Sequence, residues 1–211
     1  MKALRRRAPG LGIQGEEGAS YAGTSAWRAV IDPIDGTAAF VAGLPTWCVC
    51  IGLLHRDRIA AGVVRLPATD ETYSGFGGRA WWNGRRLRPP AEGEGDRFVL
   101  ADAKVHRRGG LAYPGKVRSM GSTAYHVVLV ARGVAEGALV GQAHVWDLAA
   151  PGAVLHAVGG RYEYLGGGRV DLATLADGGR APDRIIAAPA RRIAALRPLF
   201  SSAGRHMGGG A

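Results

Sequence analysis

The stretch DPIDGT, residues 32–37, follows a short apolar run, Trp27–Ile31, that is typical of a β-strand. Asp32 is therefore expected at the end of a strand, where ligands commonly bind in α/β sheets. Pro33 fixes its own φ angle and stiffens the turn, so Asp32 and Asp35 can converge on one point. This stretch predicts both a sheet edge and a functional site.

Two carboxylates at close range repel each other unless a cation lies between them. Mg²⁺ suits such a pair, because it binds a few carboxylates together with water and phosphate oxygens, and the Ile34 carbonyl offers one more oxygen. Gly36 and Thr37 follow at a predicted helix start, where backbone N–H groups can bind phosphate and the Thr37 hydroxyl can orient water. The alternative is that Asp32 and Asp35 only cap a turn and a helix.

Two further acidic clusters, Glu16-Glu17 and Trp146-Asp147, favour the metal interpretation over simple capping. Taken alone, Glu16-Glu17 is typical of a solvated surface pair. Taken alone, Asp147 is typical of a helix N-cap. Each gains weight only in combination with residues 32–37.

Strand and helix patterns are interleaved irregularly, with more hairpins in the first half of the chain. Asn83-Gly84 is a strong hairpin signal, because both residues tolerate positive φ. Apolar spacing predicts helices over 122–132, with Ser122 as N-cap, and over 147–158. The order favours a mixed α/β layered fold, as one domain over residues 1–200, rather than a doubly wound sheet. Residues 1–15 are predicted as a loop or a frayed start, and 201–211 as a disordered tail.

The 211 residues suffice for one domain with a full core, and the net charge is +10. Charge alone is weak evidence for nucleic acid, since no recognition motif accompanies it. No apolar run reaches about 18 residues and no secretory signal is evident, so we expect no membrane span and a cytoplasmic location.

The two cysteines, Cys48 and Cys50, lie two positions apart in an apolar run, so on a strand they share one face. They are too few for a disulfide framework and lack a zinc-ligand spacing. We expect them to be small buried apolar residues in a reducing compartment.

At this point the motifs resemble those of the inositol monophosphatase family. The DPIDGT stretch matches the first family signature, and WDLAA at 146–150, followed by Gly159-Gly160, matches the second. Gly15-Glu16-Glu17 is similar to the upstream acidic motif, and Gly121-Ser122-Thr123 to the loop on the phosphate side. The matches extend over about residues 10–190 in the family order, which makes them far more specific than one short motif.

The resemblance implies a Mg²⁺-dependent, lithium-sensitive hydrolase in which a metal-activated water attacks a small phosphorylated metabolite, a phosphate monoester. It implies an α/β (mixed α+β) sandwich with α-β-α-β layers, a homodimer and two or three Mg²⁺ ions. The implied metal ligands are Glu16, Asp32, Ile34, Asp35 and Asp147. The implied catalytic residues are Glu16, Asp32 and Thr37. The implied substrate-binding residues are Asp35, Gly36, Thr37, Gly121, Ser122, Thr123 and Asp147.

The sequence departs from the family pattern in two places. Only 14 residues precede Gly15, where the family has two helices, so we expect an N-terminally shortened chain with apolar sheet surface exposed. A catalytically impaired family remnant that acts as a binding protein is therefore the alternative. Val140 stands where inositol-specific members have a Glu, and it cannot accept a hydroxyl hydrogen bond. Histidinol phosphate, a sugar bisphosphate and phosphoadenosine phosphate therefore join inositol phosphate as candidate substrates.

Overall fold

The computed structural model describes residues 2–18, 20–88, 98–105 and 111–201. The predicted tail therefore lies, apart from residue 201, outside the described residues. The helices are α1 (Lys2–Arg7), α2 (Thr37–Val41), α3 (Thr123–Arg132), α4 (Val145–Ala157) and α5 (Ile193–Ser201). The first-sheet strands are β1 (Gly12–Gly15), β2 (Ser20–Tyr21), β3 (Trp27–Asp35), β4 (Cys48–His55), β5 (Arg58–Leu66), β6 (Glu71–Phe76), β7 (Arg79–Trp82) and β8 (Arg85–Leu87). The second-sheet strands are β9 (Phe98–Ala101), β10 (Lys116–Arg118), β11 (Ala138–Val140), β12 (Gly160–Tyr164) and β13 (Ile185–Pro189).

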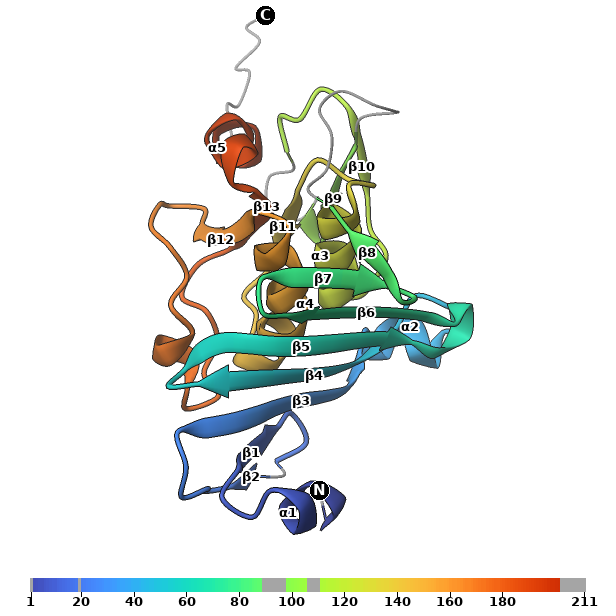
Figure 1. Cartoon of the computed structure of the whole chain (residues 1–211). Coiled ribbons are helices and arrows are strands. Elements are labelled where there is room, and N and C mark those ends of the chain that lie inside the picture. Colours follow the sequence, from blue (N-terminus) through green and yellow to red (C-terminus); the bar gives the residue numbers. More distant parts are fainter. Residues whose placement is uncertain (1, 19, 89–97, 106–110, 202–211) are drawn as a thin grey trace, which may run out of the picture.

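Two sheets enclose a layer of helices (Figure 1). The larger sheet has the strand order β2-β1-β3-β4-β5-β6-β7-β8, and the smaller has the order β10-β9-β11-β13-β12. Helices α3 and α4 pack between the sheets, while α5 packs on the other face of the smaller sheet (Figure 1). The mixed α/β layered fold predicted from the sequence is confirmed, although the described layers run sheet, helices, sheet, helix.

The start of the chain differs from the prediction of a loop over residues 1–15. It forms α1 and then β1, which pairs in parallel with β3 and antiparallel with β2. Ile13, from β1, is 2% exposed, so this short strand is a packed part of the sheet. The sequence did not predict this strand, because four residues are too few to show the alternation of apolar and polar side chains that identifies a strand.

The hairpin at Asn83-Gly84 and the helix capped by Ser122 are confirmed. Asn83 and Gly84 have φ of 47° and 75°, and Trp82 pairs with Arg85 across the turn. The Ser122 side chain accepts a hydrogen bond from the Tyr125 backbone N–H at 3.0 Å. The helix predicted from Asp147 begins two residues earlier, at Val145.

A row of glycines brings α4 close against the larger sheet. Gly52, Gly62 and Gly75 are direct partners on β4, β5 and β6. A Cβ atom on Gly62 would lie 2.3 Å from the carbonyl oxygen of Ala150, and one on Gly75 would lie 2.4 Å from that of Ala153. The absence of side chains here fixes the depth at which α4, and with it Asp147, sits above the sheet.

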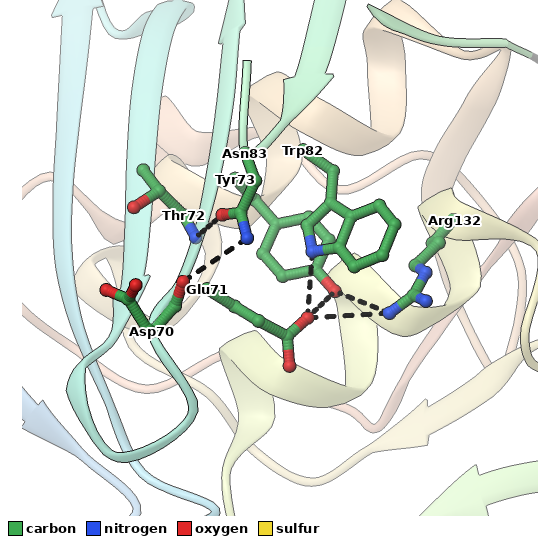
Figure 2. A network of polar contacts seen from close by, with 7 residues as sticks. All are labelled: Asp70, Glu71, Thr72, Tyr73, Trp82, Asn83 and Arg132. Carbon is green, nitrogen blue, oxygen red and sulfur yellow. Dashed lines mark hydrogen bonds and ion pairs between the residues drawn. The ribbon is translucent and has the colours of Figure 1, made fainter. Parts of the chain in front are cut away.

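A single carboxylate oxygen links the far strands of this sheet to α3 (Figure 2). Glu71 Oε2 accepts hydrogen bonds from the Tyr73 hydroxyl at 2.7 Å and from Trp82 Nε1 at 2.9 Å. Arg132, at the end of α3, lies 3.4 Å from the same oxygen and places its guanidinium 3.6 Å from the centre of the Trp82 ring. These contacts anchor the C-terminal end of α3 to β6 and β7.

The other face of the larger sheet presents apolar side chains to solvent. Ile51 and Val63, paired at the centre of the sheet, are 43% and 42% exposed, and Phe76 is 68% exposed. The expectation of exposed apolar sheet surface is confirmed. None of the helices in the described part of the chain is long and apolar enough to cross a membrane.

The glycine row gives a test of the packing. We expect Gly62→Val to lower the free energy of unfolding by at least about 2 kcal/mol, because the side chain collides with helix backbone that cannot move aside alone. Chemical denaturation monitored by circular dichroism measures the loss. Ala61→Val, on the neighbouring residue whose side chain faces away from α4, should change the same quantity by less than about 0.5 kcal/mol. Equal effects of the two substitutions would contradict this account of the packing.

Candidate metal centre

An irregularity in β3 places Asp32 and Asp35 on the same face of the sheet. Residues three apart on a regular strand point to opposite faces. Here the register shifts between the two, so that Asp32 pairs with Cys50 and Asp35 pairs with Cys48. Because Cys48 and Cys50 share a face of β4, the bulge at Pro33-Ile34 turns both carboxylates the same way.

Glu16 reaches the same edge of the sheet through parallel pairing. Gly15 at the end of β1 pairs with Ile31, and the Glu16 backbone N–H donates to the Ile31 carbonyl at 3.1 Å. Glu16 therefore follows β1 at the level where Asp32 follows Ile31. Its carboxylate is exposed and close enough to Asp32 to contribute to raising the pKa of that group.

Asp147 enters the site from the first turn of α4. Its Oδ2 accepts a hydrogen bond from the backbone N–H of His144, the residue before the helix, at 2.7 Å. Ligand atoms of Asp32, Asp35 and Asp147 lie within 4.8 Å of one another. The N-cap of α4 is His144, so the expectation that Asp147 caps this helix is wrong. Asp147 is the third helical residue, and its carboxylate belongs to the acidic cluster.

The negative charges of these carboxylates repel one another, and this repulsion adds to the effect of burial in raising the pKa values of Asp32 and Asp147. Burial, together with the charges of Asp35 and Glu16, raises the pKa of Asp32 to about 9. Burial and the charge of Asp35 raise the pKa of Asp147 to about 7. An all-oxygen set of this kind fits a hard divalent cation, whose charge removes the repulsion.

Asp35 is held by the start of α3. Burial raises the pKa of this carboxyl, while hydrogen bonds from Ser122 and from the Ala124 backbone oppose that rise. Its Oδ2 accepts a bond from the Ser122 hydroxyl and one of 2.7 Å from the Ala124 N–H. Ser122 is 1% exposed, so its side chain is committed to Asp35 and to capping α3.

The segments expected around phosphate lie in contact. Gly36 has a φ of 91°, and a Cβ on it would lie 3.1 Å from the Gly121 carbonyl oxygen. The Thr37 hydroxyl is exposed and donates to the Ile34 carbonyl at 3.1 Å. Thr123 is half-buried at the first position of α3. The roles of these residues toward substrate stay predictions.

A cleft of about 450 Å³ lies beside the acidic cluster. Glu16, Gln14, Arg28, Trp146 and Asp177 are among its lining residues. Glu16, which acts on Asp32, is the residue that the cleft and the acidic cluster have in common. Val140, in contrast, is 2% exposed within β11, so it belongs to the core.

One cation near the site was missed by the sequence reasoning. Arg180 is exposed, donates through Nε to His144 Nε2 at 3.2 Å, and lowers the pKa of Asp147 through its charge. Since Nε2 accepts that bond, His144 Nδ1 carries the proton and donates to the Gly178 carbonyl at 2.8 Å. The His144 ring stacks on Trp146 with centroids 4.5 Å apart. No motif distinguishes Arg180 among the many arginines of the chain.

Comparison with known proteins gives the family. The family model described as "Inositol monophosphatase family" matches residues 1–197. A relative from Mycobacterium tuberculosis, "Probable inositol 1-monophosphatase ImpA", is 34% identical over 169 residues, which cover 72% of this chain and 63% of that protein. A "Histidinol-phosphatase" from the same organism is 33% identical over 79% of this chain and 70% of its own length.

A solved structure, the native "extragenic suppressor protein suhB" from Bartonella henselae, superposes with a TM-score of 0.81 at 26% identity, covering 95% of this chain and 80% of that one. This chain spans less than two thirds of the length of the first relative named above. The fold, the order of the motifs and the match over residues 1–197 agree, and the chain belongs to the inositol monophosphatase family.

Proposed function

We propose that this protein is a Mg²⁺-dependent phosphatase that hydrolyses a small phosphate monoester. The observation that carries the proposal is the convergence of Asp32, Asp35 and Asp147 within 4.8 Å, with Glu16 beside Asp32. Family membership supports a metal-dependent phosphomonoesterase, and named relatives include inositol and histidinol phosphatases. A homodimer and lithium sensitivity belong to the same proposal.

In the proposed site Glu16, Asp32, Asp35, Asp147 and the Ile34 carbonyl hold the ions. Bound Mg²⁺ supplies charge neutralisation and Lewis-acid polarisation of phosphate oxygens. The charges of Asp35, Glu16 and Asp147 all act on Asp32, so its carboxylate would gain most from the neutralisation that bound ions supply. The buried hydrogen bonds to Asp35 oppose the rise in its pKa that burial causes, and they orient its carboxylate.

The attacking water is proposed to lie between Thr37 and Glu16. The Thr37 hydroxyl proton is engaged by the Ile34 carbonyl, so the Thr37 oxygen is left to accept a hydrogen bond from water. That bond aims a water lone pair away from Thr37. The exposed Glu16 carboxylate can then accept the water proton as general base.

Phosphate is proposed to lie over the start of α2, near the Gly36–Gly121 contact. Backbone N–H groups at a helix start lack carbonyl partners within the helix and favour anions. The substrate's remaining part is assigned to the cleft lined by Glu16 and Trp146. Val140 is buried in β11 and has no hydroxyl acceptor, so the proposal assigns it no contact with the substrate.

The first test replaces a central ligand. Asp32→Asn should lower kcat/KM for phosphate release by more than about 100-fold, because removing even an outer partner of a metal site costs 10–100-fold. Its free energy of unfolding without Mg²⁺ should not fall, because Asn cannot ionise and so avoids the cost that burial and the neighbouring carboxylates place on an ionised Asp32. The matched control is Glu17→Gln, on the exposed neighbour of Glu16.

The assay uses a panel of inositol, histidinol, sugar and nucleoside phosphates with Mg²⁺, and with Mg²⁺ plus Li⁺. Retained activity in Asp32→Asn would refute the ligand assignment. A folded wild type that binds Mg²⁺ and turns over none of the panel would favour the impaired binding protein instead.

Magnesium should stabilise the protein in a pH-dependent manner. The folded pKa values of Asp32 and Asp147, about 9 and about 7, lie above the unfolded value of about 4. The stability gained from protonated carboxyls is therefore present below about pH 4 and is lost as pH rises through the folded values. Mg²⁺ offsets that loss, so the rise in melting temperature should be larger at about pH 8 than at about pH 5. An equal rise in melting temperature at both pH values would contradict this prediction. The same rise with Na⁺ at matched ionic strength would also contradict it.

Arg180 should assist binding of anionic substrates. We expect Arg180→Gln to raise KM up to about tenfold, equivalent to about 1.4 kcal/mol, with a smaller effect on kcat. Arg169→Gln is the charge-matched control, since Arg169 is exposed and acts electrostatically on His156 near the other end of α4. Equal KM changes in both variants would assign the effect to net charge.

A further inference from the structure

We propose that Cys48, Cys50 and Asp35 form a second metal site, for a thiophilic divalent cation such as Zn²⁺ or Cd²⁺, behind the acidic cluster. One Sγ from each cysteine and one Asp35 oxygen lie within 4.8 Å of one another. This site shares Asp35 with the proposed Mg²⁺ site but does not depend on hydrolysis.

The distances between the donor atoms match those around tetrahedral zinc. Zn–S bonds of about 2.3 Å at the tetrahedral angle place two sulfurs about 3.8 Å apart, and a sulfur and an oxygen about 3.6 Å apart. Cys48 Sγ lies 3.8 Å from Cys50 Sγ and 3.6 Å from Asp35 Oδ2. Two edges of the coordination polyhedron are therefore already present.

The origin of this geometry is the register of β3 on β4. Asp32 pairs with Cys50 and Asp35 with Cys48, so the bulge that gathers the carboxylates also brings them over the two thiols. Both cysteines are 0% exposed and Asp35 is 6% exposed. The sequence-based expectation of small apolar residues holds for burial, but these thiols also contact a buried carboxylate.

The donor set selects the kind of ion. Thiolates are soft ligands that favour Zn²⁺, Cd²⁺ or Cu⁺ over Mg²⁺, whereas the neighbouring all-oxygen cluster has the opposite preference. Binding of one divalent ion releases the two thiol protons to solvent. The Ser122 hydroxyl lies 3.4 Å from Cys48 Sγ, but it is engaged by Asp35 and by the start of α3.

Occupation of this site has a consequence for Asp35. Its Oδ2 now accepts hydrogen bonds from Cys48, Ser122 and the Ala124 backbone. Coordination would replace the hydrogen bond from Cys48 by a metal bond to the same carboxylate. A thiophilic ion should therefore compete with Mg²⁺ through their common ligand.

Cadmium titration of the reduced, full-length protein tests the site. Thiolate coordination gives an ultraviolet charge-transfer band, and because the chain has two cysteines, any such band comes from this pair. We expect the band to saturate at one equivalent of Cd²⁺ in the wild type. It should be lost in both Cys48→Ala and Cys50→Ala.

Asp147→Asn separates this inference from the proposed function. That variant lacks a Mg²⁺ ligand, so it should lose hydrolysis and keep the cadmium band. A folded wild type without the band, or a band that persists in Cys50→Ala, overturns the thiol site while leaving the phosphatase proposal intact. Should a cysteine variant fail to fold, the wild-type and Asp147→Asn titrations still decide the question.

Discussion

Mutual repulsion among buried carboxylates is the constraint on which this structure depends. Asp32, Asp35 and Asp147 come from a strand bulge and a helix start, and their ligand atoms lie within 4.8 Å. Burial and neighbouring charge raise the pKa values of Asp32 and Asp147. A fold that holds like charges this closely stores unfavourable energy that a divalent cation relieves, as is typical of functional sites.

The surrounding architecture consists of the elements that hold those groups in place. The glycine row on β4, β5 and β6 lets α4 approach the sheet closely enough for Asp147 to reach Asp32. The parallel pairing of β1 with β3 brings Glu16 to the same edge. Helix α3, anchored at its far end by Arg132, aims the Ser122 hydroxyl and the Ala124 N–H at Asp35.

Several features of the fold and of the acidic cluster could be predicted from the sequence, because their sequence signals are local. The DPIDGT stretch, the Asn83-Gly84 turn and the Ser122 cap each depend on neighbouring residues only. The bulge that turns Asp32 and Asp35 to one face could not be read, since it is a property of the register with β4. The short strand β1 was missed because its place is set by pairing with β3. Arg180 reaches His144 only through the tertiary fold.

The two cysteines show how the same bulge gives one residue two chemistries. From their spacing alone, Cys48 and Cys50 are expected to be small buried apolar residues on one face of a strand. Once β3 is shifted against β4, Asp35 belongs both to a cluster with Asp32 and Asp147 and to a cluster with the two thiols. Hard and soft donors then share a single carboxylate, so the two proposed sites compete for Asp35. Selectivity between metals would therefore act through Asp35, the ligand that the proposed Mg²⁺ site and the proposed thiol site have in common.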